Sequence, residues 1–166
     1  MKTYKINYQL DKFNRTIDGL IKAFSRNNLD ETSILFLAKR TRNLMSFTHM
    51  FWLHIIFRIF DKVGDMKYKF DEEVFDTNKI VDIIFEEINR SLENLISRKV
   101  DKDKQDDIDN IINNLFIFKD LFSYIGDILI SILKFQSHNM SEDQFRLKYK
   151  DFKRDLSDIK NRLNMN

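Results

Sequence analysis

The sequence predicts an all-α fold: a single-domain bundle of about five helices, two of them long, with no sheet. The 166 residues contain no proline and only three glycines, whereas a sheet protein of this size needs more turn-forming residues. Apolar residues recur three and four positions apart along most of the chain, which is typical of amphipathic helices. The length suits one domain with its own core, and no linker divides the chain.

The first half of the chain predicts an arm and two helices. The first eight residues, MKTYKINY, alternate between apolar and polar positions and are expected to form an extended arm. A first helix is predicted near residues 9–26. Asn28 or Asp30 can cap a second helix, which is expected to run to about residue 62. Its apolar segment 44–60 is expected to be the central helix of the bundle, because it is apolar on nearly all sides. The segment is too short and too charged to span a membrane.

The second half predicts three more helices. Residues 64–73 are expected to form a loop with a short helical turn around DEEVF. A third helix is predicted near residues 77–99 from apolar residues at helical spacing. The polar turn 101–107 then begins a fourth helix, whose apolar positions run from Ile108 to Phe135.

The last helix begins where Ser141 and Gln144 fit a capping box. Its apolar residues from Phe145 to Leu163 alternate at spacings of four and three, a narrow seam like that of a coiled coil. The seam either packs on the bundle or recruits a partner helix, with Phe152 as the anchor. The opposite face is either an ordinary solvated surface or a binding face for RNA or an acidic partner. Its cations are Lys148, Lys153, Arg154, Lys160 and Arg162.

The net charge of +2 is unevenly spread along the chain. Residues 1–60 carry ten Lys and Arg against four Asp and Glu, residues 61–110 carry nine against fifteen, and residues 111–166 carry nine against seven. An acidic middle between basic ends indicates either complementary internal faces or separate patches for partners. The chain has no cysteine, which excludes disulfides and thiolate metal sites and favours a reducing compartment such as the cytoplasm.

The apolar segment also contains residues suited to chemistry. Arg42, Ser46 and His49 fall on one stripe of the predicted helix, since seven residues are close to two helical turns. An Arg and a His on one face suit RNA cleavage: the His would take the proton of a 2′-hydroxyl and the Arg would hold the phosphate charge. His54 lies on a different face from His49, so the two histidines cannot share a metal ion there.

Arg42 and Asn43, followed after five further residues by His49, resemble the motif of the HEPN superfamily. These are helical bundles of similar size that include ribonucleases, toxins and defence proteins. Their motif is an Arg, often followed by Asn, His or Asp, and then a His after four to six intervening residues. The resemblance implies a metal-independent ribonuclease with Arg42 and His49 as catalytic residues. It also implies a homodimer, because the sites of that family are composite.

The residues support two function hypotheses. The first is a cytoplasmic binding protein (a small subunit, an adaptor, or an inhibitor in phage–host conflict) that acts through protein or nucleoprotein contacts without catalysis. Its expected partner is a protein or a larger complex, with RNA and a second copy of the chain as alternatives. The second is the HEPN-like ribonuclease that uses Arg42 and His49. No cofactor or metal site is expected, since the acidic run 101–112 lacks the glycine and the final glutamate of an EF-hand loop.

Overall fold

The structure, a computed structural model, describes residues 3–27, 29–49, 70–97 and 104–165. In these ranges it contains helices and no strand, which confirms the all-α prediction. Two helices, with 27 and 33 residues, are longer than the others. No helix within these ranges has both the length and the apolar character needed to cross a membrane. The five helices are α1 (Thr3–Phe24), α2 (Glu31–Phe47), α4 (Asp71–Ser97), α5 (Lys104–Gln136) and α6 (Glu142–Arg162).

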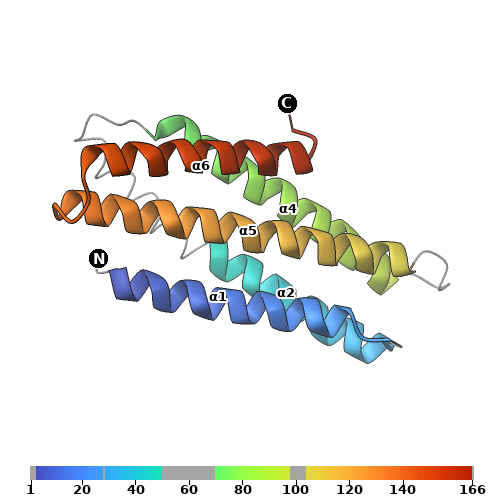
Figure 1. Cartoon of the computed structure of the whole chain (residues 1–166). Coiled ribbons are helices and arrows are strands. Elements are labelled where there is room, and N and C mark those ends of the chain that lie inside the picture. The colour runs from blue at the N-terminus through green and yellow to red at the C-terminus, as the bar shows by residue number, and fades with distance from the viewer. Residues whose placement is uncertain (1–2, 28, 50–69, 98–103, 166) are drawn as a thin grey trace.

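The central helix is α5. It runs between α1 and α6, antiparallel to both, and α4 crosses it on the side facing away from the viewer (Figure 1). Fifteen of its 33 residues are buried, so it is covered on several sides. Gly126 lets α1 come close, because a Cβ atom there would overlap the side chain of Leu10. The prediction that segment 44–60 is central is wrong for its described part: α2 packs against α1 and α4, and residues 50–60 lie outside the described ranges.

Two helix starts confirm the predicted caps. The Asp30 carboxylate accepts a hydrogen bond from the Ser33 N–H at 2.7 Å and caps α2. This hydrogen bond lowers the pKa of Asp30. At α6 the Ser141 hydroxyl accepts from the Gln144 N–H at 3.2 Å, and the Gln144 side chain accepts from the Ser141 N–H at 3.0 Å. The N–H groups of Ser141 and Gln144, which have no partner within the helix, are therefore both satisfied by side chains.

Two predicted boundaries are wrong. The expected extended arm is helical from Thr3, because Ile6 continues the apolar stripe of α1 into the core. The third helix begins at Asp71 and not near residue 77, so the end of the predicted 64–73 loop belongs to α4. The carboxylates of its first turn suit a helix N-terminus. Residues 64–69, and residues 50–62 of the predicted second helix, lie outside the described part of the chain.

The apolar seam of α6 packs on the bundle. Phe145, Phe152, Leu156 and Ile159 are buried, and α6 lies against α5 and α4. The Phe145 ring stacks on Phe135 near the end of α5, with the centroids 4.7 Å apart. The last helix is therefore held by the core and belongs to the folded unit.

Phe152→Ala is expected to lower the free energy of unfolding by about 3–5 kcal/mol, because it leaves a cavity under α6. The Phe152 side chain is 2% exposed. Equilibrium urea unfolding measures the loss. Phe75→Ala is the matched control, since Phe75 is 65% exposed and its loss should cost about 0.5 kcal/mol or less. Equal effects of the two substitutions would contradict the packing of α6.

Candidate functional site

Helix α2 has a groove along each of its two flanks. The buried residues of α2 face the bundle. The hydroxyls of the buried Thr41 and Thr48 each donate a hydrogen bond of 2.7 Å to a backbone carbonyl oxygen four residues earlier. Thr48 and His49 continue the helix in a wider π-type turn. One flank of α2 borders α4 and the other borders α1.

The α2–α4 groove brings together all three residues that the sequence predicts to be catalytic. It has a volume of about 670 Å³. Arg42, Ser46 and His49 line it from α2, and all three are exposed. Met45 and Phe85 add apolar surface to the groove. The predicted stripe of α2 is thus a real surface, and it is open to a ligand.

The other wall of this groove comes from α4. Asp82, Glu86, Asn89 and Glu93 line it, at spacings of four, three and four residues, which places them on one face of the helix. We call these four residues the α4 stripe. The sequence alone does not single them out as a site, although their spacing in α4 marks them as a polar face.

His49 of the α2 wall contacts two residues of the opposite wall. Its Nε2 atom lies 3.7 Å from the Asp82 Oδ1 atom. Its ring meets the edge of the Phe85 ring, with the centroids 5.8 Å apart. More than half of each side chain, His49 and Asp82, is exposed, so water surrounds this contact and it contributes little to stability.

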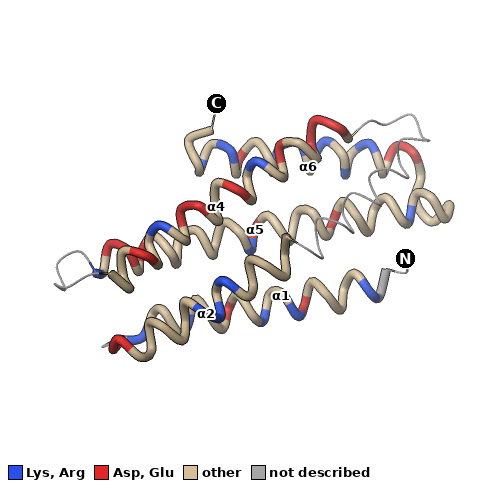
Figure 2. The backbone as a smooth tube through the Cα atoms, turned by 180° about the vertical axis from the view of Figure 1, so that it is seen from behind, with Lys and Arg blue, Asp and Glu red and all other residues tan. Residues whose placement is uncertain are grey.

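The α2–α4 groove carries an excess of negative charge. Among the described residues, its lining includes the carboxylates of Asp82, Glu86 and Glu93 against one guanidinium, that of Arg42. Among the described residues, the side chains of Arg42, Glu86 and Glu93 make no hydrogen bond or ion pair. Helix α4 as a whole has eight carboxylates and two cations, and red segments follow it in Figure 2. This field attracts cations and repels phosphate.

The chemistry of the groove is that of charge recognition. Arg42 and His49 are about 10 Å apart along the axis of α2. A phosphate placed between them would face the carboxylates of α4, which would oppose its binding. Within the described ranges, no three His, Cys, Asp or Glu side chains converge as ligands of a metal ion.

The predicted basic face of α6 is largely committed to contacts inside the protein. Three of its cations reach carboxylates on other helices, so they tie α6 to the first two turns of α4 and to the middle of α5. The pairs are Lys153 with Glu73 (Nζ to Oε1, 3.8 Å), Lys160 with Asp76, and Arg162 with Asp120 (NH1 to Oδ2, 2.5 Å).

The remaining residues predicted for α6 lie apart from these ties. Arg154 forms ion pairs with Asp151 and Asp155, at 3.3 and 3.5 Å. Burial raises the pKa of Asp155, although Arg154 acts in the opposite direction. Lys148 lines a small cavity of about 100 Å³ between α5 and α6. Phe152 also borders it, but its side chain is in the core.

A buried carboxylate fixes the start of α4 against α6. The Glu73 side chain is 5% exposed, and its Oε1 atom accepts a hydrogen bond of 2.8 Å from the Tyr149 hydroxyl. Burial raises the pKa of Tyr149, and the hydrogen bond to Glu73 and its negative charge raise it further. The hydroxyl therefore remains a donor to the carboxylate well into alkaline solution.

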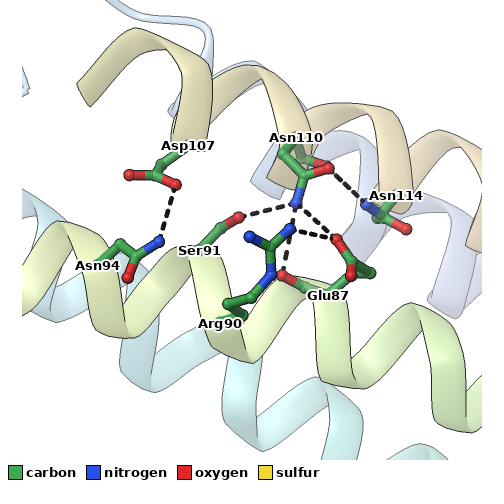
Figure 3. Close-up of polar contacts among 7 residues, drawn as sticks. All are labelled: Glu87, Arg90, Ser91, Asn94, Asp107, Asn110 and Asn114. Carbon is green, nitrogen blue, oxygen red and sulfur yellow. Dashed lines mark hydrogen bonds and ion pairs between the residues drawn. The ribbon is translucent and has the colours of Figure 1, made fainter. Parts of the chain in front are cut away.

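A network of amides and carboxylates links α4 to α5 (Figure 3). The Asn110 amide donates to the Ser91 hydroxyl at 2.8 Å and to the Glu87 carboxylate at 3.4 Å. Arg90 donates to the same carboxylate oxygen at 2.6 Å, and the Asn114 amide donates to the Asn110 carbonyl at 2.9 Å. The Arg90 and Asn114 bonds lie within α4 and α5, whereas the two bonds of Asn110 cross from α5 to α4. The crossing bonds require a particular pairing of the helices, so they fix the register of α4 and thereby the position of its stripe.

Comparison of the chain with models of protein families, with curated proteins and with solved structures finds no match. The resemblance of Arg42, Asn43 and His49 to the HEPN motif stays a prediction from the residues. The function of the chain is therefore inferred from the shape and charge of the two grooves beside α2.

Tyr149→Phe is expected to lower the free energy of unfolding by about 1–3 kcal/mol near neutral pH, since a buried carboxylate loses its donor. The raised pKa of Tyr149 means that the unfolded chain releases this proton first. Stability is therefore lost as the pH rises above about 10, the ordinary value for tyrosine. The variant lacks this loss, so its deficit should shrink above that pH.

Urea unfolding at a series of pH values tests this expectation. Tyr8→Phe is the matched control, because Tyr8 is 60% exposed on α1. A deficit for Tyr149→Phe that stays constant between neutral and strongly alkaline pH would show that the hydroxyl does not hold Glu73.

Proposed function

We propose that the protein is a binding protein and that its α2–α4 groove receives a basic segment of a partner protein. The observation that carries the proposal is the α4 stripe, whose carboxylates face an open groove. Glu86 and Glu93 lack partners among the described residues. Such a surface binds Lys or Arg side chains at little cost, because its charges remain hydrated until the partner arrives.

The rest of the groove suits a peptide. The α4 stripe runs from Asp82 to Glu93, eleven steps of about 1.5 Å or about 16 Å along the helix, which corresponds to about five residues of extended chain. Ser46 and Asn89 offer a hydroxyl and an amide for the partner's backbone, and Met45 and Phe85 offer apolar surface. The aliphatic stems of Lys and Arg pack on such surface while their charged ends reach the carboxylates. A subunit, adaptor or inhibitor would use a groove of this kind.

The ribonuclease is the second candidate, and one observation favours it. Arg42, Ser46 and His49 line the same open groove, and His49 lies beside a carboxylate that can orient its ring. The facing carboxylates of the α4 stripe weigh against it, since they repel the phosphate that Arg42 would have to hold. Catalysis and peptide binding are therefore tested on opposite walls of the same groove.

The binding test uses a fluorescent peptide of alternating Arg and Ala residues, measured by anisotropy. Glu86→Gln with Glu93→Gln should weaken binding by about twofold to thirtyfold, since each of the two exposed ion pairs contributes about 0.2–1 kcal/mol. Asp106→Asn with Asp158→Asn is the matched control, because both residues are exposed and the net charge changes equally. If the two double variants weaken binding equally, the peptide responds only to the net charge of the protein, and the groove is not its binding site.

The cleavage test incubates the purified protein with single-stranded RNA in the absence of metal ions. The expected result is intact RNA. If RNA is cut, and if His49→Ala and Arg42→Ala each abolish cutting without changing the melting temperature, the groove is a ribonuclease site and the peptide proposal fails. Cleavage that survives both substitutions arises elsewhere, and the peptide measurements then decide the role of the groove.

A further inference from the structure

The second groove lies on the opposite flank of α2, against α1. It has a volume of about 280 Å³, and it shares no described lining residue with the α2–α4 groove. Its lining combines aromatic rings with cations and contains no carboxylate among the described residues. The residues are Lys12, Phe13 and Thr16 of α1 and Arg40, Asn43, Leu44 and Phe47 of α2.

An exposed aromatic ring is fixed at the edge of this α1–α2 groove. Phe47 is 40% exposed. Its inner side contacts the buried Phe13 ring, with the centroids 5.5 Å apart. Phe13 in turn stacks on Phe122 of α5 at 4.8 Å, nearly parallel. The exposed ring is therefore held by the core, and a planar ligand can stack on it without having to order it first.

The aromatic surface continues along α2. Phe36, Arg40, Asn43 and Phe47 are spaced by four, three and four residues, so they share one flank over about 16 Å. Phe36 is 61% exposed. The Arg40 Cζ atom lies 5.8 Å from the centroid of the Phe36 ring, and the Lys12 Nζ atom lies 5.8 Å from that of Phe47. Each exposed ring is thus accompanied by a cation.

The charges of this flank are positive. Helices α1 and α2 together carry seven Lys and Arg against three Asp and Glu, and blue segments mark both in Figure 2. Among the described residues, Lys12 and Arg40 form no ion pair with a carboxylate. Their charge is available to an anion, in contrast to the three cations of α6 that tie helices together.

We infer that the α1–α2 groove binds a single-stranded nucleic acid, with a base stacked on Phe47 and the adjoining phosphate between Lys12 and Arg40. A single strand alternates planar bases with negative charges, which matches the alternation of rings and cations. The volume of about 280 Å³ leaves room for one base. An acidic peptide would use the cations but would leave the exposed rings without a function. The inference does not rest on the proposed function, because it concerns a different surface.

Fluorescence anisotropy with a labelled oligouridylate of about 12 nucleotides tests the inference, since single-strand sites cover about 4–16 nucleotides. Lys12→Gln with Arg40→Gln should weaken binding about tenfold, and it should lower the slope of log K against log salt by about 0.7, since both cations hold the same phosphate and each neutralised phosphate contributes about 0.7. Arg26→Gln with Lys150→Gln is the matched control, because both residues are exposed. It should change binding less than about twofold by the same electrostatic reasoning.

The aromatic part of the inference has its own variant. Phe47→Leu keeps an apolar side chain on Phe13 but removes the stacking surface. Binding should fall by about fivefold or more, the lower end of what one stacked base contributes, with the salt slope unchanged. Circular dichroism confirms that the variant is folded, and the Lys12 and Arg40 substitutions test the site independently of that packing.

Three outcomes would overturn the inference. They are no binding of the oligonucleotide at low salt, equal losses in the groove and control variants, and displacement of the oligonucleotide by oligoglutamate at equal charge concentration. An oligothymidylate of the same length distinguishes the source of the ligand. Tighter binding of oligouridylate assigns RNA, and equal or tighter binding of oligothymidylate assigns single strands in general.

Discussion

The burial of α5 is the constraint on which the rest of the structure depends. Helices α1, α4 and α6 all pack against this central helix. Helix α2 packs against α1 and α4 instead, so it lies over the boundary between them and both of its flanks border a groove. The functional surfaces of the protein follow from this placement, because one flank of α2 forms a groove with α1 and the other forms a groove with α4.

A row of rings connects α5 with both grooves. Phe118 and Phe122 of α5 are in contact, with their centroids 4.6 Å apart. Phe118 contacts Phe85 at 5.2 Å, and Phe122 contacts Phe13 at 4.8 Å. Phe85 lines the α2–α4 groove and Phe13 lines the α1–α2 groove. The two grooves are therefore built on one aromatic core, but their charges differ. The cations of the α1–α2 groove come from both helices, as Lys12 and Arg40, and the carboxylates of the α2–α4 groove come from α4.

Local signals in the sequence predicted the local features of the fold. The caps at Asp30 and Ser141 and the seam of α6 depend on residues close together in the chain, and the structure confirms them. The start of α1 was mistaken because Ile6 fits both an alternating pattern and the helical stripe that buries it. The stripe of Arg42, Ser46 and His49 was visible as a helical face, but the carboxylates opposite them come from α4, about forty residues later in the chain. The pairing of α2 with α4 brings these two sets of residues together, and no local sequence pattern predicts that pairing.

Helix α2 separates two grooves of opposite charge, and this separation is the central claim about the function of the fold. Nuclear magnetic resonance of the isotopically labelled protein tests it directly, by adding an arginine-rich peptide to one sample and oligouridylate to another. The peptide should shift the amide signals of residues 82–93 in α4 and leave those of residues 12–16 in α1 unchanged. The oligonucleotide should do the reverse. Both ligands are expected to shift signals of α2, which lines both grooves. If both ligands shift the signals of α4, or both shift those of α1, the two grooves are not separate sites and the claim is wrong.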